Sequence, residues 1–317
     1  MEFPVALGRS GPLTGAVFAK KSNAGIGFTL FLTVAFWGGN NVGTKYLVRD
    51  WPPLFIGCTR LLGAGLILAA ILRWTDWLGA RSPHTPAIRR GLWWQGGLSL
   101  ALYIFIFNSA LQQTTAGHVA LYLGIAPIWA LLLEERPAWT RQSLRRYGAA
   151  GLAVLGVVVL CLPKWRTGEL HWSGELLGVA TGFFWTYYSR QCRKLAAGGL
   201  SGAEVSAETM CRAGLWLLPP TVLEAVRRGA LVWRWDLVGI QVYGILVGGV
   251  ICYALWNNGL RHWPTSRVFL FNNLIPLATM TWAWIFLGEP FTATFWVATG
   301  LIMSGVALGQ ARFVTQK

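Results

Sequence analysis

Residues 115–134, TAGHVALYLGIAPIWALLLE, form a run of about twenty predominantly apolar residues, long enough to cross ~30 Å of hydrocarbon as a helix. Pro127 interrupts this run. Residues 265–287, TSRVFLFNNLIPLATMTWAWIFL, carry Pro276 in a similar run, 149 positions further along the chain. Two related membrane-spanning segments are therefore predicted, and further segments of the same kind decide the fold.

The composition is that of a membrane protein. Of the 317 residues, 54% are hydrophobic and 12% are charged, and 19 are tryptophans. The net charge is +15, but the basic residues lie mostly in short gaps between apolar runs, where positive charge sets membrane orientation. We therefore predict a lipid bilayer as the surroundings and no nucleic-acid partner.

The five cysteines lie singly in apolar runs, without a CxxC pair and without a histidine at metal-ligand spacing. They are expected to act as small buried hydrophobic residues. No metal site and no cofactor is predicted.

Ten apolar runs are long enough to span a membrane. Residues 1–24 precede them as a short basic tail, and the gaps between them are too short for a separate domain. The predicted spans are 25–48, 53–73, 91–113, 115–134, 144–163, 173–195, 203–223, 236–260, 265–287 and 291–312. The chain is thus predicted to be an all-α, multi-pass membrane protein.

The basic residues orient these spans. With a cytoplasmic N-terminus, 18 basic residues fall on the inner side and 7 on the outer side. Cytoplasmic loops are enriched in Lys and Arg, so both termini are predicted to be cytoplasmic.

The two halves of the chain also match each other. Pro127 matches Pro276 by 149 positions, Phe36 matches Phe184 by 148, and Arg60 matches Arg212 by 152. A repeat of five spans is odd-numbered, so the second copy must be inverted in the membrane. Repeats of this kind build secondary transporters around a site near the membrane midplane.

The same residues resemble a known family. The first half contains AFWGGNNVGTKYL (35–47) and WPPLFIGCTRLLGAGLILA (51–69), and the second half ends with FLGEPFTATFWVATGLIMSGVAL (286–308). The FWG-x-N, PP-x₆-R and L-G-E-P patterns resemble the EamA domains of the drug/metabolite transporter superfamily. The resemblance covers about residues 25–312, with repeats at 25–163 and 173–312.

This resemblance implies ten helices in two inverted five-helix repeats, and alternating access around a central cavity. In the family, the first, third, fourth, sixth, eighth and ninth helices line that cavity. One departure concerns the fourth helix, since Glu134 and Glu135 lie 7 and 8 residues beyond Pro127, whereas Glu289 lies 13 beyond Pro276. Either this helix is short or the two acids are drawn toward the cytoplasmic mouth.

Seven of the eight asparagines lie within predicted spans. An amide without a partner in hydrocarbon costs a few kcal/mol, so these side chains face either other helices or a wet cavity. Because successive helical residues point about 100° apart, one member of each NN pair is expected to join helices while the other faces the cavity. Asn40 is the expected cavity member on the first helix, whereas Asn257 and Asn258 lie near a cytoplasmic end, where solvation at the interface is expected.

Helix-weakening residues lie at similar depth. Gly38 and Gly39 are expected to weaken or open the first helix, which would free backbone groups for a ligand or for close packing. Pro127 and Pro276 each remove a backbone donor, which would leave the carbonyls of Leu123 and Asn272 free. Gly39, Pro127 and Pro276 are therefore predicted gating or kink positions, although static kinks are also common in membrane helices.

Charged residues within the spans are rare. Arg60 has no acidic residue in its own span, and substrate contact, the capping of backbone carbonyls between the repeats, or snorkelling of the side chain to an interface would explain it. Arg212 is expected to pair with Glu208, one helical turn earlier. Glu208 is the only intramembrane carboxylate singled out, and His118 is expected to be a satisfied interface residue.

Deep aromatic residues supply the rest of the predicted site, although packing or lipid-facing roles are the alternative for each of them. The predicted substrate cavity consists of Trp37, Asn40, Tyr103, Asn108, Tyr122, Trp185, Tyr188, Trp256, Asn272 and Asn273.

The predicted function is secondary transport. A small polar or amphipathic metabolite, an amino acid or a related solute, would be exported across a bacterial inner membrane by a monomer or homodimer. The alternative is a transporter or flippase for a phosphate-bearing nucleotide sugar or lipid-linked solute, which would require several basic residues in the cavity. An enzyme is not expected, since the sequence shows no Ser/His/Asp set, no HExxH motif and no carboxylate pair.

Overall fold

The computed structural model describes residues 23–75, 78, 82–134, 141–168, 171–228 and 231–310. The predicted basic tail lies outside this range except for its last two residues, and so does Glu135. The described residues form helices and connecting turns without any strand. Inside a membrane, only helices and closed barrels satisfy all backbone polar groups. An all-helical structure is therefore what the apolar composition requires.

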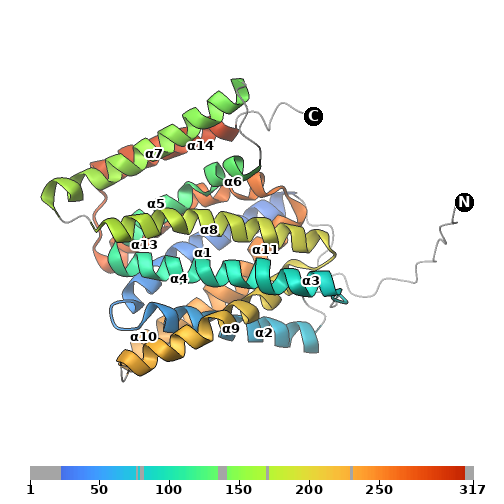
Figure 1. The fold of residues 1–317 in the computed structure, drawn as a ribbon. Coiled ribbons are helices and arrows are strands. Elements are labelled where there is room, and N and C mark those ends of the chain that lie inside the picture. The colour runs from blue at the N-terminus through green and yellow to red at the C-terminus, as the bar shows by residue number, and fades with distance from the viewer. Residues whose placement is uncertain are drawn as a thin grey trace, which may run out of the picture.

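The first half of the chain forms five helical rods (Figure 1). The third and fourth rods each contain more than one segment. In chain order the segments are α1 (Asn23–Leu47), α2 (Pro53–Trp74), α3 (Pro86–Gly91) with η1 (Leu92–Gly97) and α4 (Leu98–Gln113), α5 (Ala116–Gly124) with α6 (Ala126–Glu134), and α7 (Arg141–Thr167).

The second half forms five more rods in the same pattern. They are α8 (Trp172–Ala197), α9 (Gly202–Arg228), α10 (Trp235–Tyr243) with η2 (Gly244–Ile251) and α11 (Cys252–His262), α12 (Thr265–Val268) with η3 (Phe271–Leu274) and α13 (Ile275–Leu287), and α14 (Ala293–Gln310). Each predicted span falls on one of these ten rods of the described chain. The predicted all-α membrane fold is confirmed.

Length and composition alone mark four rods as able to cross a membrane. They are Pro53–Trp74, Pro86–Gln113, Tyr147–Thr167 and Trp235–His262. The other rods are less apolar, shorter or interrupted, and they are held in the bundle by their neighbours.

The packing follows the repeat. α2 packs against α9, α7 against α14 and α5 against α13, so matching rods of the two halves meet. α1 packs against α13 and, in the matching pair, α8 packs against α5 and α6. In Figure 1, α7 and α14 run side by side at one edge of the bundle, away from the centre.

Both halves contain a π-helical segment at the same place in their third rod. η1 packs on α9, and η2 packs on α2. Glycines allow these close contacts: a Cβ on Gly97 would lie 2.7 Å from Arg212 Cβ, and one on Gly244 would lie 2.8 Å from Arg60 Nε. The two intramembrane arginines therefore occupy related positions.

The predicted kink positions have two outcomes. Each proline follows a break, because α6 begins one residue before Pro127 and α13 begins one residue before Pro276. By contrast, α1 runs unbroken through Gly38 and Gly39, so these glycines do not open it. A Cβ on Gly38 would lie 2.7 Å from the carbonyl carbon of Ala278, which shows that Gly38 serves close packing against α13, whereas a Cβ on Gly39 would lie 3.1 Å from the Tyr243 hydroxyl of α10.

Candidate functional site

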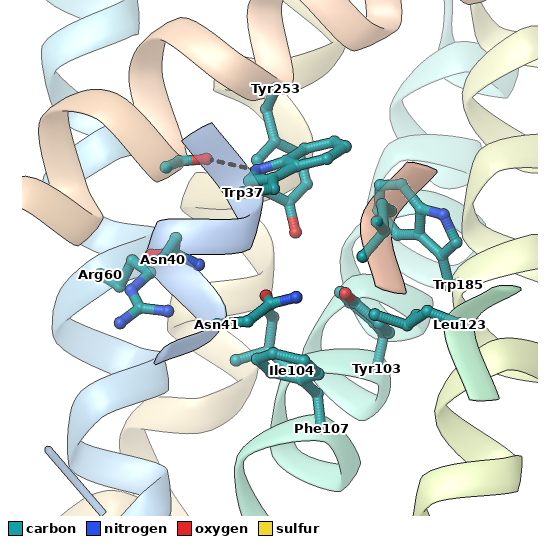
Figure 2. Close-up of a pocket in the computed structure, with 12 residues that line it drawn as sticks. Trp37, Asn40, Asn41, Arg60, Tyr103, Ile104, Phe107, Leu123, Trp185 and Tyr253 are labelled. Atoms are coloured by element: carbon teal, nitrogen blue, oxygen red, sulfur yellow. Dashed lines mark hydrogen bonds between the residues drawn. The ribbon is translucent and has the colours of Figure 1, made fainter. Parts of the chain in front are cut away.

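A small cavity lies at the centre of the bundle (Figure 2). Its volume is about 30 Å³, which holds one or two water molecules but no metabolite. Its walls come from both halves of the chain and consist of Trp37, Asn40, Asn41, Arg60, Tyr103, Ile104, Phe107, Leu123, Trp185, Gly248, Tyr253 and Ile275.

Aromatic rings form much of the wall. The rings of Trp37 and Trp185 lie edge to face with centroids 5.3 Å apart, and Tyr103 lies 5.0 Å from Trp185. Trp256 packs behind them, 5.2 Å from Trp37 and 5.5 Å from Trp185. The Trp37 indole donates a hydrogen bond of 2.9 Å to the Gly248 carbonyl, which fixes its ring (Figure 2). Such faces attract cations and aromatic groups.

Arg60 gives the cavity wall its only full positive charge. Its Nη1 donates to Thr44 Oγ1 at 2.9 Å and its Nη2 to Gln241 Oε1 at 3.5 Å, while Nε has no hydrogen-bond partner. The side chain is buried, and no carboxylate of the described chain pairs with it. A buried cation held only by neutral groups favours an anionic ligand.

The FWGGNN amides meet at this site. The side chain of Asn40 lies beside Arg60, and its Oδ1 has no hydrogen-bond partner (Figure 2). Asn41 also lines the cavity, and its Nδ2 donates to Thr279 Oγ1 of α13 at 3.0 Å. The structure thus gives Asn41 both of the roles that were expected to be divided within the pair.

The amides of the ninth rod lie just outside the cavity wall. Asn272 and Asn273 are buried in η3, next to the lining residue Ile275. Neither side-chain atom of Asn272 has a hydrogen-bond partner among the described residues. The expectation of a free Asn272 carbonyl was wrong, because the tighter 3₁₀ turn brings the Ile275 N–H to it.

Three other predicted lining residues join helices instead. The Asn108 amide donates to the Pro53 carbonyl at 2.9 Å, and the Tyr122 hydroxyl binds Glu175. The Tyr188 hydroxyl lies 3.1 Å from Thr209 Oγ1. Helical register explains the first two positions, because the adjacent residues, 107 and 123, line the cavity.

Arg212 does not reach the cavity. It forms the expected pair with Glu208, and its guanidinium lies 5.4 Å from the centre of the Trp93 ring. Its charge is therefore neutralised locally, unlike that of Arg60.

The WNNG segment differs from the expectation of simple solvation at an interface. Asn257 is buried, and its amide donates to Ser206 Oγ on α9 at 2.8 Å. It therefore joins α11 to α9. Neighbouring rods exclude water from this position. The sequence alone does not show where these rods lie.

The sequence reasoning missed two groups. Tyr253 and Phe107 line the cavity, and helical spacing from Trp256 and Tyr103 could have identified them. Glu175 was also missed, although it is buried and hydrogen-bonded to His118, which was noted. His118 and Glu175 each lie near the start of a predicted span, and these two starts are on the same side of the membrane. This shared depth was the signal from which their contact could have been predicted.

Known proteins share this sequence pattern. A protein of Salmonella typhimurium named "Probable amino-acid metabolite efflux pump" is 25% identical, with 88% of this chain and 93% of that protein aligned. An Escherichia coli protein of the same name is 24% identical over equal shares. A "S-adenosylmethionine/S-adenosylhomocysteine transporter" of Chlamydia trachomatis is 24% identical, with 89% and 88% aligned.

A solved structure titled "Crystal structure of protein" has the same fold, with a TM-score of 0.62 and 20% identity over 92% of this chain and 98% of that one. Residues 25–162 and 172–309 each match the family described as "EamA-like transporter family". The chain, with its ten rods and central cavity, therefore belongs to the EamA-like transporter family and is a transporter rather than an enzyme.

Proposed function

We propose that this small-metabolite transporter exports amino acids, or metabolites with an amino-acid headgroup, across a bacterial inner membrane. The observation that carries the proposal is Arg60, a buried and unpaired cation at the edge of an aromatic cavity. A carboxylate would neutralise the guanidinium through charge-assisted hydrogen bonds.

The aromatic part of the wall suits the other end of a zwitterion. The rings of Trp37, Trp185 and Tyr253 lie around the cavity, and Asn40 Oδ1, beside Arg60, is an acceptor without a hydrogen-bond partner. An ammonium group is attracted to ring faces and to amide oxygens. The relatives named for amino-acid metabolites and for S-adenosylmethionine, which contains an amino-acid headgroup, support the same class.

A phosphate-bearing solute suits the cavity less well. Phosphate is usually held by several basic groups or by backbone N–H groups at a helix N-terminus. Among the cavity-lining residues only Arg60 is basic, and Arg212 is paired elsewhere. The nucleotide-sugar and lipid-linked alternatives are therefore disfavoured.

Transport requires this cavity to enlarge and to open alternately to each side. The breaks before Pro127 and Pro276 are the proposed hinges, since both lie in rods that contribute to the cavity wall. Cytoplasmic termini, as the basic residues indicate, would place the α1 C-terminus on the outer side. We retain the prediction that the transporter is a monomer or a homodimer.

Counterflow tests the proposal. Proteoliposomes are loaded with an unlabelled amino acid, and entry of the labelled form is compared with entry of the decarboxylated amine and of the deaminated acid. We expect saturable counterflow of amino acids and much weaker counterflow of both analogues, with protein-free liposomes as the baseline. Equal counterflow of the decarboxylated amine, or none across a broad amino-acid panel, would contradict the proposed substrate class.

A further inference from the structure

A second hollow, of about 510 Å³, lies between α1, α10 and α13. Its volume is within the range of about 300–1,000 Å³ that is typical of sites for drug-sized ligands. Gly239, Trp282 and Phe286 line it and are exposed, so the hollow opens to the outside of the bundle, where lipid lies. We call this hollow the α1 groove.

The α1 groove is separate from the substrate cavity. Successive residues of a helix point about 100° apart, so Gly39, Gly43 and Tyr46 share one face of α1, while Trp37 and Asn41 lie on the opposite face. The first three residues line the groove, and the other two line the cavity. The floor of the groove is therefore the back of a helix that forms the cavity wall.

The groove follows α1 from its middle toward its C-terminal end. The seven residues from Gly39 to Tyr46 span about 10 Å of helix, which is about a third of the ~30 Å of hydrocarbon in a bilayer. Glycine at positions 39 and 43 leaves the floor without side chains. A hydrocarbon chain can therefore lie directly against the α1 backbone.

The deep part of the groove has apolar walls, although two of its side chains carry polar atoms. The Tyr243 hydroxyl donates to the Phe36 carbonyl at 3.0 Å, and the Trp282 indole donates to the Ala35 carbonyl at 3.2 Å. Both polar atoms are thus bound to α1. What these residues present to a ligand is ring surface, which suits an acyl chain.

The other end of the groove is charged. Asp236, at the start of α10, accepts hydrogen bonds from the Tyr46 hydroxyl at 2.9 Å and from Arg234 Nε at 3.1 Å. Arg234 also lies 3.8 Å from Asp50, and the Arg49 guanidinium lies 5.6 Å from the centre of the Tyr46 ring. Two carboxylates and two guanidinium groups give this charged cluster no net charge.

Aromatic residues place the charged cluster at the level of the lipid headgroups. Trp233 and Trp235 flank Arg234 in the sequence, and both indoles are exposed. Exposed tryptophans gather where a membrane meets water. The groove therefore joins a charged end at the interface to an apolar end in the hydrocarbon, which is the arrangement of a phospholipid.

The charges favour a zwitterionic head with N–H donors. Arg234 is shared by Asp50 and Asp236, so one carboxylate is in excess there and can accept hydrogen bonds from a primary ammonium. No carboxylate of the described chain pairs with Arg49, which can donate to a phosphate. An anionic head would meet two carboxylates without a cation to offer them, and a choline head has no N–H to donate.

We propose that the α1 groove binds one phospholipid of the surrounding bilayer with an ethanolamine head. The head lies at the charged cluster, and one acyl chain lies along Gly39 and Gly43. The lipid contacts the face of α1 opposite the substrate cavity. This assignment does not depend on which metabolite the protein transports.

Native mass spectrometry of the purified full chain tests the proposal. The protein is mixed in detergent with phosphatidylethanolamine, phosphatidylcholine or phosphatidylglycerol of identical acyl chains, and the fraction with one bound lipid is measured. Because the cluster is exposed to water, we expect a preference of about two- to fivefold for the ethanolamine lipid. Equal binding of the three lipids, or a preference for either of the others, would overturn the proposal.

Gly239→Leu tests the position of the acyl chain. A Cβ on Gly239 would have no other atom within 4 Å, so the leucine fits and fills the groove. G239L should keep its melting temperature and lose the tightly bound ethanolamine lipid. Gly300→Leu is the matched control, because Gly300 is also an exposed helical glycine with an open Cβ position, but it lies on α14 outside the groove. Unchanged lipid binding in G239L, or the same loss in G300L, would contradict the assignment.

Asp236→Asn tests the position of the head. It raises the net charge of the cluster by one, so D236N should shift its preference from the ethanolamine lipid toward anionic phosphatidylglycerol. Glu208→Gln also removes a carboxylate that pairs with an arginine, Arg212, but outside the groove, and it should keep the wild-type preference. An unchanged preference in D236N would refute the proposed position of the head. Because these measurements use lipid binding alone, they are independent of the counterflow result.

Discussion

Arg60→Met separates a role of the guanidinium in binding from a role in folding. The substitution keeps an unbranched apolar side chain in the same space and removes the charge. It also removes the hydrogen bonds to Thr44 and Gln241. Thr44 Oγ1 still donates to the Asn40 carbonyl at 2.7 Å, so its hydroxyl keeps a partner.

The effect on stability is the balance of two opposing terms. A charged arginine in the middle of the membrane costs roughly 3 kcal/mol on insertion scales, and this cost disappears in R60M. Each hydrogen bond from the charged group contributes about 1.5–3 kcal/mol, and these contributions are lost. We therefore expect the variant to fold, with a free energy of unfolding lower by about 0–3 kcal/mol.

The effect on binding has no such compensation. A substrate carboxylate loses its charge-assisted hydrogen bonds, about 1.5–3 kcal/mol, which corresponds to affinity about 10- to 150-fold weaker. The measurement is equilibrium binding of the labelled amino acid found by counterflow, on purified protein. Binding of the decarboxylated amine should be nearly unchanged.

Arg212→Met is the matched control, because Arg212 holds the related position in the second repeat but pairs with Glu208 outside the cavity. It should lower stability and leave affinity unchanged. If R60M binds the amino acid as tightly as wild type does, Arg60 serves the fold and the proposed recognition of a carboxylate is refuted.

Three further pairs of variants test packing and recognition. Gly202→Ala should lower the melting temperature by a destabilisation of about 1–3 kcal/mol, since the Cβ would lie 2.4 Å from a backbone nitrogen of α11. Gly300→Ala should leave the melting temperature equal or raise it, because the added Cβ would have no other atom within 4 Å. Asn40→Ala and Asn272→Ala should reduce counterflow without loss of membrane insertion, and normal counterflow in both would show that neither amide takes part in transport. Trp185→Leu should weaken binding by about 0.5–2 kcal/mol and Trp185→Phe by less, whereas equal affinity in the two would exclude a cation–π contact.

The sequence predicted the fold almost completely, because each membrane-spanning segment must have a certain length and an apolar composition. Each apolar run of about twenty residues became a rod, and the offset between Pro127 and Pro276 marked related rods that meet as α5 and α13. Segment breaks were harder to predict. Gly38 and Gly39 looked like helix-weakening residues, but a tightly packed neighbour keeps α1 intact.

The site was only partly predictable, since sequence shows how deep a residue lies but not which way it faces. Trp37, Asn40, Tyr103 and Trp185 were named and line the cavity, whereas Asn108 lies one helical step away from it. A step of about 100° separates a ligand contact from an interhelical hydrogen bond. That rotation depends on the packing of the whole bundle.

The two ends of the bundle differ chemically at related positions. The offset of 149 relates His118 to Arg267, and the offset of 148 relates Glu175 to Gly27. At that second end the Arg267 guanidinium lies 3.8 Å from the centre of the Trp263 ring. A Cβ on Gly27 would lie 3.6 Å from the same ring. A glycine and an aromatic ring thus stand where the first end has a buried carboxylate.

This difference bears on direction. An inverted repeat by itself gives two end states, open to one side or to the other, built from the same contacts and therefore of similar free energy. Because hydrogen bonds to a buried carboxylate join helices at one end and a cation lies against a tryptophan ring at the other, the two end states differ in free energy, and one of them is favoured before any substrate binds.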